Sequence, residues 1–250
     1  MSQPSCVVEE KPAKNLASLV KNAALENLTS ALIHQWNIRE AFHEVNEFGI
    51  KPIDRALFYG PPGNGKTMAA QMIAREIDVP LYRVRCESMI TSALGSTESN
   101  MANTLAWISM QGPAVVLFDE CEAIFPKRSG GADQCSQTIV RAMQVFWQQL
   151  DRWESPQLFL LATNMIEQLD DALISRLELK LEFVAPTSDQ ALKVISYWAE
   201  TLHEYGAESW SAALEKQIKK GKKPESFRQL WQWISDSVRA NIVAANPGDA

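Results

Sequence analysis

Residues 60–67 read Gly-Pro-Pro-Gly-Asn-Gly-Lys-Thr and complete the phosphate-binding pattern G-x-x-x-x-G-K-[ST]. A loop that wraps a triphosphate must expose successive backbone N–H groups through dihedral angles that residues bearing Cβ mostly avoid, so glycine suits it. Lys66 is expected to bridge the β- and γ-phosphates, and the Thr67 hydroxyl to hold Mg²⁺. The predicted nucleotide-binding residues are Gly60, Pro61, Pro62, Gly63, Asn64, Gly65, Lys66, Thr67 and Met68.

Two adjacent acids, Asp119 and Glu120, follow the apolar run Val-Val-Leu-Phe at 115–118. A parallel sheet presents its ligands at the carboxyl ends of its strands, which is where these acids are expected. Asp119 is predicted to orient Mg²⁺, usually through water, and Glu120 to polarise the lytic water as a general base. Asn164 ends another apolar run and has the polarity to position water beside the γ-phosphate, with capping of the next turn as the alternative. These residues predict Mg²⁺-dependent hydrolysis of ATP.

Strands that alternate with helices must position these side chains. The predicted strands are 55–59, 80–85, 114–118, 157–162 and a short one near 178–183, and the helices between them are 66–77, 97–110 and 133–150. The phosphate loop therefore lies between a buried strand and a helix N-terminus. The alternation predicts an α/β fold of the P-loop NTPase type, with a five-stranded parallel sheet flanked by helices.

The chain divides into three regions by pattern. Residues 1–15 are predicted to be a flexible tail, and 16–185 the nucleotide-binding α/β domain, which opens with two helices over 16–47 that meet near 34–37. After Pro186 only helical periodicity remains, interrupted near 205–206 and 220–224, so 186–250 is predicted to be a small helical domain. The tryptophans from Trp147 onward are expected to serve packing rather than a cofactor cage.

Composition restricts the class of protein. The 250 residues include 46% hydrophobic and 22% charged side chains, ordinary values for a soluble globular protein. No apolar run approaches the roughly 18 residues of a membrane span, no signal-peptide core is present, and the four cysteines form no C-x-x-C pair. A cytoplasmic location is therefore expected. The net charge of −6 disfavours a large nucleic-acid footprint, and the basic stretch 216–223 is interpreted as a solvated helix end, with phosphate-backbone contact as the alternative.

With these motifs, the chain resembles the AAA family of ATPases, within the larger AAA+ group, from about Leu16 to Phe183. Gly-Pro-Pro-Gly-x-Gly-Lys-Thr is the family's form of the loop. Further similar segments follow in order: 94–100, similar to the pore loop and the next helix; 118–125, similar to the second nucleotide motif; 150–151, similar to the inter-subunit signalling turn; 162–164, similar to the first sensor; and 169–176, similar to the arginine-finger segment.

The resemblance implies an ATP-dependent homo-oligomer, usually a ring of six subunits with ATP bound at each interface, and makes 186–250 a helical lid. Arg176 would act on the γ-phosphate of the neighbouring subunit. Arginine suits this role because its guanidinium is always charged and matches phosphate oxygens in geometry. A surface ion pair with Glu178 or Asp171 is the alternative. Arg228 is a candidate second sensor reaching from the lid, or else an ordinary helix-surface arginine.

Three departures from the family pattern limit this inference. Ala93 stands where members that thread polypeptides usually place an aromatic residue, and Leu94 follows it. Ser175 precedes Arg176, so the finger segment holds one arginine where many members hold two. No folded N-terminal domain is expected before Leu16, so recognition would fall to the tail, the lid or a partner.

Three functions are therefore considered. The leading hypothesis is an ATP-driven oligomer that remodels or disassembles a protein substrate or complex. The alternative is an ATP-controlled ring adaptor that recruits or activates an effector, such as a nuclease, protease or transposase, without threading. The third is a nucleic-acid loader, which the acidic pI of about 5.2 disfavours.

Overall fold

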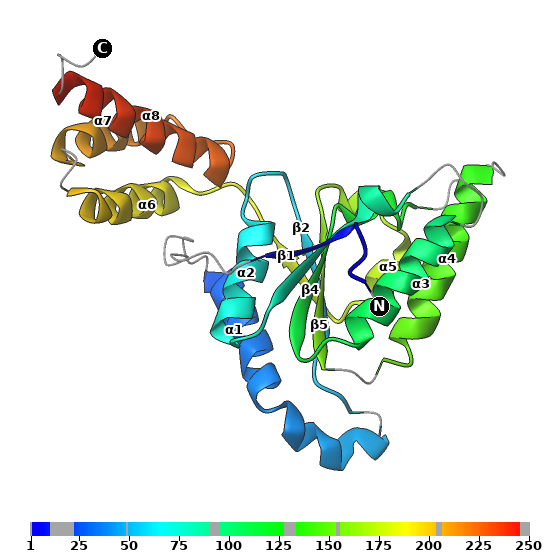
Figure 1. Cartoon of the computed structure of the whole chain (residues 1–250). Helices are drawn as coiled ribbons and strands as arrows, with labels where there is room; N and C mark the ends of the chain where they lie inside the picture. The colour runs from blue at the N-terminus through cyan, green and yellow to red at the C-terminus, as the bar shows by residue number, and fades with distance from the viewer. Residues whose placement is uncertain are drawn as a thin grey trace. The chain divides into compact units, whose positions relative to one another are not determined.

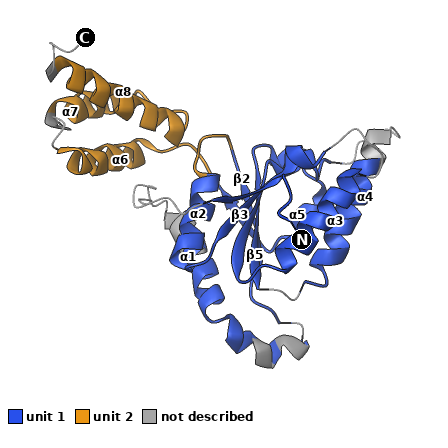
Figure 2. Ribbon diagram, in the orientation of Figure 1, with its two compact units in different colours: residues 1–13, 27–60, 66–182 blue, residues 14–26, 61–65, 183–250 orange. Residues whose placement is uncertain are grey.

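The computed structural model describes residues 2–10, 23–48, 50–90, 96–127, 134–153, 156–203 and 207–245 (Figure 1). The chain forms two compact units (Figure 2). Unit 1 comprises residues 1–13, 27–60 and 66–182, and unit 2 comprises residues 14–26, 61–65 and 183–250. Unit 1 holds the sheet, and unit 2 is helical.

The described part of unit 1 is built on one sheet of six strands in the order β1-β3-β4-β5-β2-β6. Their bounds are β1 Val7–Glu10, β2 Arg55–Tyr59, β3 Leu81–Arg85, β4 Ala114–Asp119, β5 Gln157–Thr163 and β6 Leu179–Glu182. The last five run parallel to one another, whereas β1 is antiparallel to β3. The five predicted parallel strands are confirmed, with no bound that differs from the prediction by more than one residue, but the sheet has a sixth, antiparallel strand.

Strand β1 corrects the prediction of a flexible tail over 1–15. Val7 pairs with Val84 and Glu10 pairs with Leu81, so the segment extends the sheet at the edge of β3. Four residues are too short to show a reliable period of two, and their hydrogen-bond partners lie more than 70 residues away in sequence. The strand forms because an exposed sheet edge offers unpaired backbone groups. Residues 11–15 lie outside the described residues.

Helices cover both faces of this sheet. Their bounds are α1 Ala23–Asn37, α2 Lys66–Glu76, α3 Ser96–Ser109, α4 Gln134–Leu150 and α5 Asp171–Arg176, with shorter 3₁₀ helices η1 Arg39–Phe48, η2 Cys86–Met89, η3 Cys121–Ala123 and η4 Ile166–Gln168. Helix α2 packs on β3, β4 and β5 from one side, and α3 packs with α4 on the other (Figure 1). The predicted boundary near 34–37 is confirmed, although the element that follows α1 is a 3₁₀ helix.

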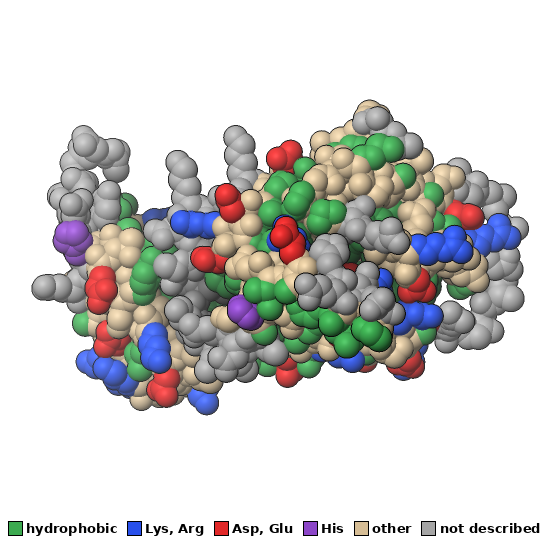
Figure 3. All heavy atoms as spheres, turned by 90° about the horizontal axis from the view of Figure 1, so that it is seen from below, with side chains coloured by type: hydrophobic (Ala, Val, Ile, Leu, Met, Phe, Trp, Pro, Cys, Tyr) green, Lys and Arg blue, Asp and Glu red, His purple; other side chains and the backbone are tan. Residues whose placement is uncertain are grey.

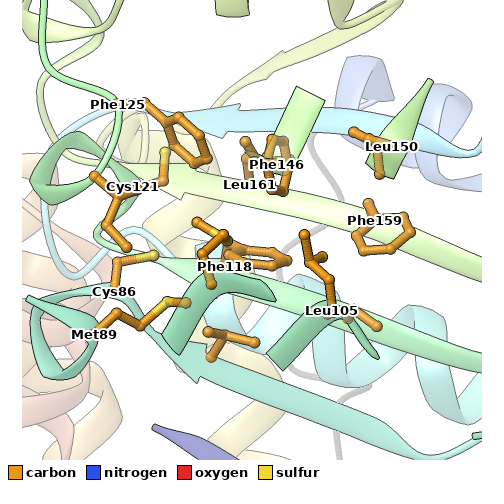
Figure 4. Close-up of a cluster of buried hydrophobic side chains, with 14 of the residues drawn as sticks. Cys86, Met89, Leu105, Phe118, Cys121, Phe125, Phe146, Leu150, Phe159 and Leu161 are labelled. Atoms are coloured by element: carbon orange, nitrogen blue, oxygen red, sulfur yellow. The ribbon is translucent and has the colours of Figure 1, made fainter. Parts of the chain in front are cut away.

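Aromatic side chains form the centre of the core between the sheet and α4 (Figure 4). The ring centroid of Phe118 lies 5.4 Å from that of Phe146 and 6.2 Å from that of Phe159, and none of the three rings is exposed. Buried aromatic groups contribute much of the apolar area that stabilises such a core. This packing fixes the ends of β4 and β5, and therefore the places of the polar residues that follow them.

After Pro186, the secondary structure in the described residues of unit 2 is helical, as predicted. Helices α6 Ser188–Thr201, α7 Ala207–Lys219 and α8 Phe227–Ala245 share a core that includes Ile195, Trp210, Leu214, Leu230 and Ile234. The break predicted near 220–224 is confirmed between α7 and α8. Trp198 and Trp231 contact each other with ring centroids 4.5 Å apart, in agreement with a packing role. No helix in the described ranges combines the length and the apolar character needed to cross a membrane.

Candidate nucleotide site

The phosphate loop, residues 60–67, joins β2 to α2. Gly63 and Gly65 have φ angles of 81° and 94°, a region that residues with a Cβ avoid. Lys66 and Thr67 are the first two residues of α2. The loop therefore ends where the first N–H groups of a helix lack intrahelical partners and can bind an anion.

Lys66 is buried, with 7% of the residue exposed. Its Nζ donates a hydrogen bond to the carbonyl oxygen of Gly60, with a distance of 2.6 Å between the atoms. The ammonium is thus held at Gly60, where the loop begins, rather than extended into solvent. Pro61, Pro62 and Met68 are exposed.

Asn64 uses its side chain to fasten the loop within unit 2. Its Nδ2 donates to the carbonyl oxygen of Phe183 at 3.4 Å, and its Oδ1 accepts from the backbone N–H of Phe227 at 3.3 Å. The residue is 3% exposed. Asn64 was predicted to contact nucleotide. Because its amide group bonds Phe183 and Phe227, such a contact would come from its backbone.

Arg228 lies near the start of α8, in unit 2. Its backbone N–H donates to the carbonyl oxygen of Gly63 at 3.0 Å, which brings its backbone against the loop. A Cβ atom built on Gly63 would lie 3.0 Å from the Cβ of Arg228, so glycine is needed for this approach. The side chain of Arg228 is exposed.

Asp119 is the last residue of β4, and both of its carboxylate oxygens accept hydrogen bonds. Oδ2 accepts from Nε of Arg83 at 2.9 Å and from Nη2 of Arg83 at 2.5 Å, and Oδ1 accepts from the backbone N–H of Glu120 at 3.1 Å. Nη1 of Arg83 also contacts Oε1 of Glu10 at 3.2 Å. Burial lowers the pKa of the Arg83 guanidinium, but Asp119 and Glu10 raise it by more, so the net shift is upward.

Glu120 adopts a left-handed backbone conformation, with φ 55° and ψ 48°. This conformation is unfavourable for a residue with a Cβ, and such outliers gather at functional sites because their surroundings hold them. Burial raises the pKa of the Glu120 carboxyl, and the negative charges of Glu87, Asp119 and Glu122 raise it further, against the opposing effect of Arg83. A higher pKa makes the carboxylate a stronger base.

Asn164 directly follows β5, the strand beside β4. Its backbone N–H donates to Oε1 of Glu122 at 3.4 Å, so the structure brings Asn164 to the acidic segment after β4. The other carboxylate oxygen of Glu122 is buried without a hydrogen-bond partner among the described residues. Where the next turn begins, at η4, the described residues include no side-chain cap, which leaves the capping alternative for Asn164 without support.

Arg176 is the last residue of α5, and its side chain is exposed. The guanidinium carbon lies 4.8 Å from the ring centroid of Trp147, on α4. Asp171, one partner considered for a surface ion pair, contacts Lys127 at 3.5 Å instead. The predicted pore-loop residues Ala93, Leu94 and Gly95 lie outside the described residues, and α3 begins directly after them, at Ser96.

Three residues near this site were not singled out from the sequence. Arg83 is a charged residue in the middle of a strand that is otherwise largely apolar, and this position could have identified it as a candidate from the sequence. Glu10 lies in the segment interpreted as a tail, and Trp147 was assigned to packing alone. Neither of these two gave a local signal, because their partners are distant in sequence.

Thr67 and Asp119 offer hydroxyl and carboxylate oxygens, the donors that Mg²⁺ prefers. In the parts of the chain that are described, no group of three or more His, Cys, Asp or Glu side chains is arranged to hold a metal ion. The two oxygen donors, Thr67 and Asp119, fit Mg²⁺, which is usually bound by one or two protein groups together with water and substrate phosphates.

Comparison with known proteins gives matches over most of the described chain. The family model described as "ATPase family associated with various cellular activities (AAA)" matches residues 56–184. The "Uncharacterized AAA family ATPase y4kL" of Sinorhizobium fredii is 30% identical over 177 residues, which cover 70% of this chain and 52% of that protein. The 26S proteasome regulatory subunit 6A of Saccharomyces cerevisiae is 27% identical over 193 residues, 75% of this chain and 44% of that protein. The 26S proteasome regulatory subunit S10B homolog B of Arabidopsis thaliana is 28% identical over 171 residues, 67% of this chain and 43% of that protein. The chain thus spans about half the length of the curated relatives that it matches.

Proposed function

The chain belongs to the AAA family of ATPases, and we propose that it hydrolyses ATP within a homo-oligomeric ring and uses that energy to remodel or disassemble a protein substrate or complex. One observation carries this proposal. The phosphate loop, the acids Asp119 and Glu120, and Asn164 lie at or directly after the carboxyl ends of β2, β4 and β5, which are neighbours in the sheet. Parallel strands bring such residues to one edge, where nucleotide-binding sheets bind their ligands.

Each residue has a role in this reaction. The loop N–H groups and the Lys66 ammonium bind the phosphates, and bound Mg²⁺, held by Thr67 and Asp119, would neutralise charge on the β- and γ-phosphates. Glu120 accepts the proton of the water that attacks the γ-phosphorus, and its raised pKa favours that transfer. Asn164 orients the water. As the new oxygen–phosphorus bond forms, the bond to the β-phosphate oxygen breaks and ADP leaves.

Arg176 completes the site of a neighbouring subunit in this proposal. Its exposure at the end of α5 leaves the guanidinium accessible to a second copy of the chain. An arginine placed in this way stabilises the charge that develops on the transferred phosphoryl group. A ring, with six subunits as the expected number, gives every subunit one such neighbour. The relatives named as proteasome regulatory subunits are themselves parts of a larger assembly by their names, which supports this arrangement.

A ring adaptor that activates an effector is the second candidate, and Ala93 favours it. Without an aromatic residue at that place, the ring lacks the side chain that usually grips a threaded polypeptide. Leu94→Ala separates the two functions. A remodeller that grips its substrate through Leu94 should lose substrate processing in this variant, whereas an adaptor should activate its partner as the wild type does.

Contact with nucleic acid is not favoured. Acidic and basic side chains are interspersed on the face shown in Figure 3, rather than gathered by sign. Within the basic stretch 216–223, Lys219 pairs with Glu215 at 3.1 Å, and Nζ of Lys222 lies 4.1 Å from the ring centroid of Trp233. Both lysines contact side chains of the helical unit itself, as expected for a solvated helix end.

A cytoplasmic location is part of the proposal. The described cysteine side chains, Cys6, Cys86 and Cys121, are free and buried, as is common for proteins in a reducing compartment.

The test of the proposed function is Glu120→Gln, which removes the base and keeps the shape of the side chain. This variant should retain ATP, lose turnover, and form a more stable oligomer in ATP and Mg²⁺, as followed by phosphate release and size-exclusion chromatography. Glu167→Gln is the matched control, because Glu167 is an exposed glutamate on η4 outside the proposed machinery. Normal turnover in Glu120→Gln would remove Glu120 from its assigned role.

A further inference from the structure

Arg83 lies between two carboxylates on one face of the sheet. In the register of the strands, Glu10 of β1 pairs with Leu81, and Asp119 of β4 pairs with Arg85. Arg83 is two residues from each of these positions on β3, so its side chain shares their face. Diagonal neighbours on a sheet are within reach of a long side chain. Arg83 can therefore contact both acids at once.

The contacts show that it does so. Nε and Nη2 of Arg83 both bond Oδ2 of Asp119, whereas Nη1 bonds Oε1 of Glu10. The exposed fractions of the three side chains are 34% for Arg83, 17% for Glu10 and 13% for Asp119. Charges that are partly buried in this way are screened less by salt than charges on an open surface.

Glu10 is itself fixed by the helix that follows the phosphate loop. Nε2 of Gln71, on α2, donates to Oε2 of Glu10 at 2.7 Å. One oxygen of Glu10 thus accepts from α2 and the other from Arg83. Through these bonds, β1 links the phosphate-loop helix to the carboxylate at the end of β4.

We propose that Arg83 competes with the nucleotide-bound metal ion for Asp119, and that Glu10 limits this competition by offering the guanidinium a second acceptor. The inference rests on the proposed function, because it takes Asp119 to be the partner of Mg²⁺. The cluster of Glu10, Arg83 and Asp119 holds two negative charges and one positive charge, so it has a net negative charge that attracts the metal ion. Without Glu10 the cluster would be neutral, and Arg83 would lie more fully on Asp119.

The expected effect follows from the charges. Loss of one charge several ångströms from a divalent cation weakens its binding by about three- to tenfold even at the dielectric constant of water. Glu10→Gln should therefore raise the Mg²⁺ concentration needed for half-maximal tightening of nucleotide binding by this factor. Arg83→Gln should lower that concentration, because it removes the competitor.

Equilibrium binding of a fluorescent ADP derivative, titrated with MgCl₂ and repeated in EDTA, measures these effects without turnover. Glu9→Gln is the matched control, since it removes the same charge from the neighbouring position of β1, where the side chain points to the opposite face. It should leave the Mg²⁺ requirement unchanged. In the Arg83→Gln background, Glu10→Gln should raise the Mg²⁺ requirement by less than it does in the wild type, because only the direct effect of its charge remains once Arg83 is absent. The change from EDTA to saturating MgCl₂ is compared within each variant, which removes any effect of the lost charge on metal-free binding.

Three results would overturn the inference: an unchanged Mg²⁺ requirement in Glu10→Gln, an equal rise in that requirement with and without Arg83, or a raised requirement in Arg83→Gln. Arg83→Gln leaves β1 intact, so it decides the question even where Glu10→Gln unfolds the strand. Failure of the proposed nucleotide site, on which the inference rests, gives a different result, because the wild-type protein would then not bind the ADP derivative in either medium.

Discussion

The backbone N–H of Arg228 donates a hydrogen bond to the carbonyl oxygen of Gly63, with the two atoms 3.0 Å apart. The phosphate loop is thereby tied to α8 at the residue proposed as a second sensor. The same approach leaves no room for a side chain on Gly63, since a Cβ would lie 3.0 Å from the Cβ of Arg228 and 3.3 Å from Oγ of Ser226. The positive φ at position 63 and the contact with Arg228 therefore both require glycine.

Gly63→Ala should impair nucleotide binding and stability together. The φ of 81° costs a residue with a Cβ about 1–2 kcal/mol, and the contact with Arg228 adds to this. We expect at least a tenfold loss of affinity for a fluorescent ADP derivative and a lower urea midpoint. Gly112→Ala is the control, because its Cβ would meet no atom within 4 Å. Equal losses of affinity and stability in Gly63→Ala and Gly112→Ala would contradict the importance of the close contact between Gly63 and Arg228.

The sequence predicts the parts of the site that are encoded locally. The strand, the loop and the helix from 55 to 77 form one continuous pattern, and Asp119 follows an apolar run that can be recognised alone. The direction of the Asn64 side chain is different, because its partners Phe183 and Phe227 are more than 100 residues away. No periodicity within the loop reveals contacts of this kind.

Partners that are distant in sequence also explain why strand β1 was not predicted. Glu10 and Arg83 face each other only because β1 pairs with β3, and that pairing is long-range. Arg176 and Trp147 are likewise brought together by the packing of α5 and α4 on one side of the sheet. The sequence suggested Arg176 as a site residue, whereas its contact with Trp147 could be found only from the fold.

Asp170→Ala should destabilise α5 and the arginine that the helix carries. Asp170 is the N-cap of this helix, and its Oδ1 accepts from the backbone N–H groups of Ala172 at 3.0 Å and Leu173 at 3.3 Å. Loss of such a cap costs about 1 kcal/mol, measurable by urea denaturation. Asp170→Asn should keep most of this stability, because asparagine also caps well.

Asp171→Ala controls for the loss of charge at the same helix end. Asp171 is 79% exposed, and its pairing with Lys127 is on the open surface, so its removal should change stability little. A larger effect for Asp171→Ala than for Asp170→Ala would contradict the capping assignment.

Asp54→Asn should alter the pH dependence of stability. Burial raises the pKa of the Asp54 carboxyl, with Arg55 acting in the opposite direction. Because the folded pKa lies above the unfolded one, the wild type gains stability from protonation at low pH and loses it as pH rises through the folded value. The stability of Asp54→Asn relative to the wild type should therefore increase from pH 3 to pH 7. Urea denaturation at both pH values measures this, and a relative stability that falls with pH would contradict the sign.

Trp147→Leu should lower ATP turnover through Arg176. The guanidinium lies over the indole ring, an arrangement that restrains the arginine by about 0.5–1 kcal/mol at an exposed site. Turnover at saturating ATP should fall severalfold, with unchanged affinity for the ADP derivative, and Trp147→Phe should retain part of the activity. In an Arg176→Ala background, Trp147→Leu should have no further effect on turnover, which separates positioning of Arg176 from general loss of packing.

Arg176→Ala should abolish turnover in a pure oligomer while nucleotide binding persists, because the residue is proposed to act on the neighbour's site. Lys66→Ala should be inactive for the opposite reason, since it cannot bind the phosphates in its own site. A mixture of the two variants should regain activity, because an Arg176→Ala subunit that binds ATP receives Arg176 from a Lys66→Ala neighbour. Phosphate release measured over a range of mixing ratios should peak near equal amounts. A mixture as inactive as its components would show that Arg176 does not act between subunits.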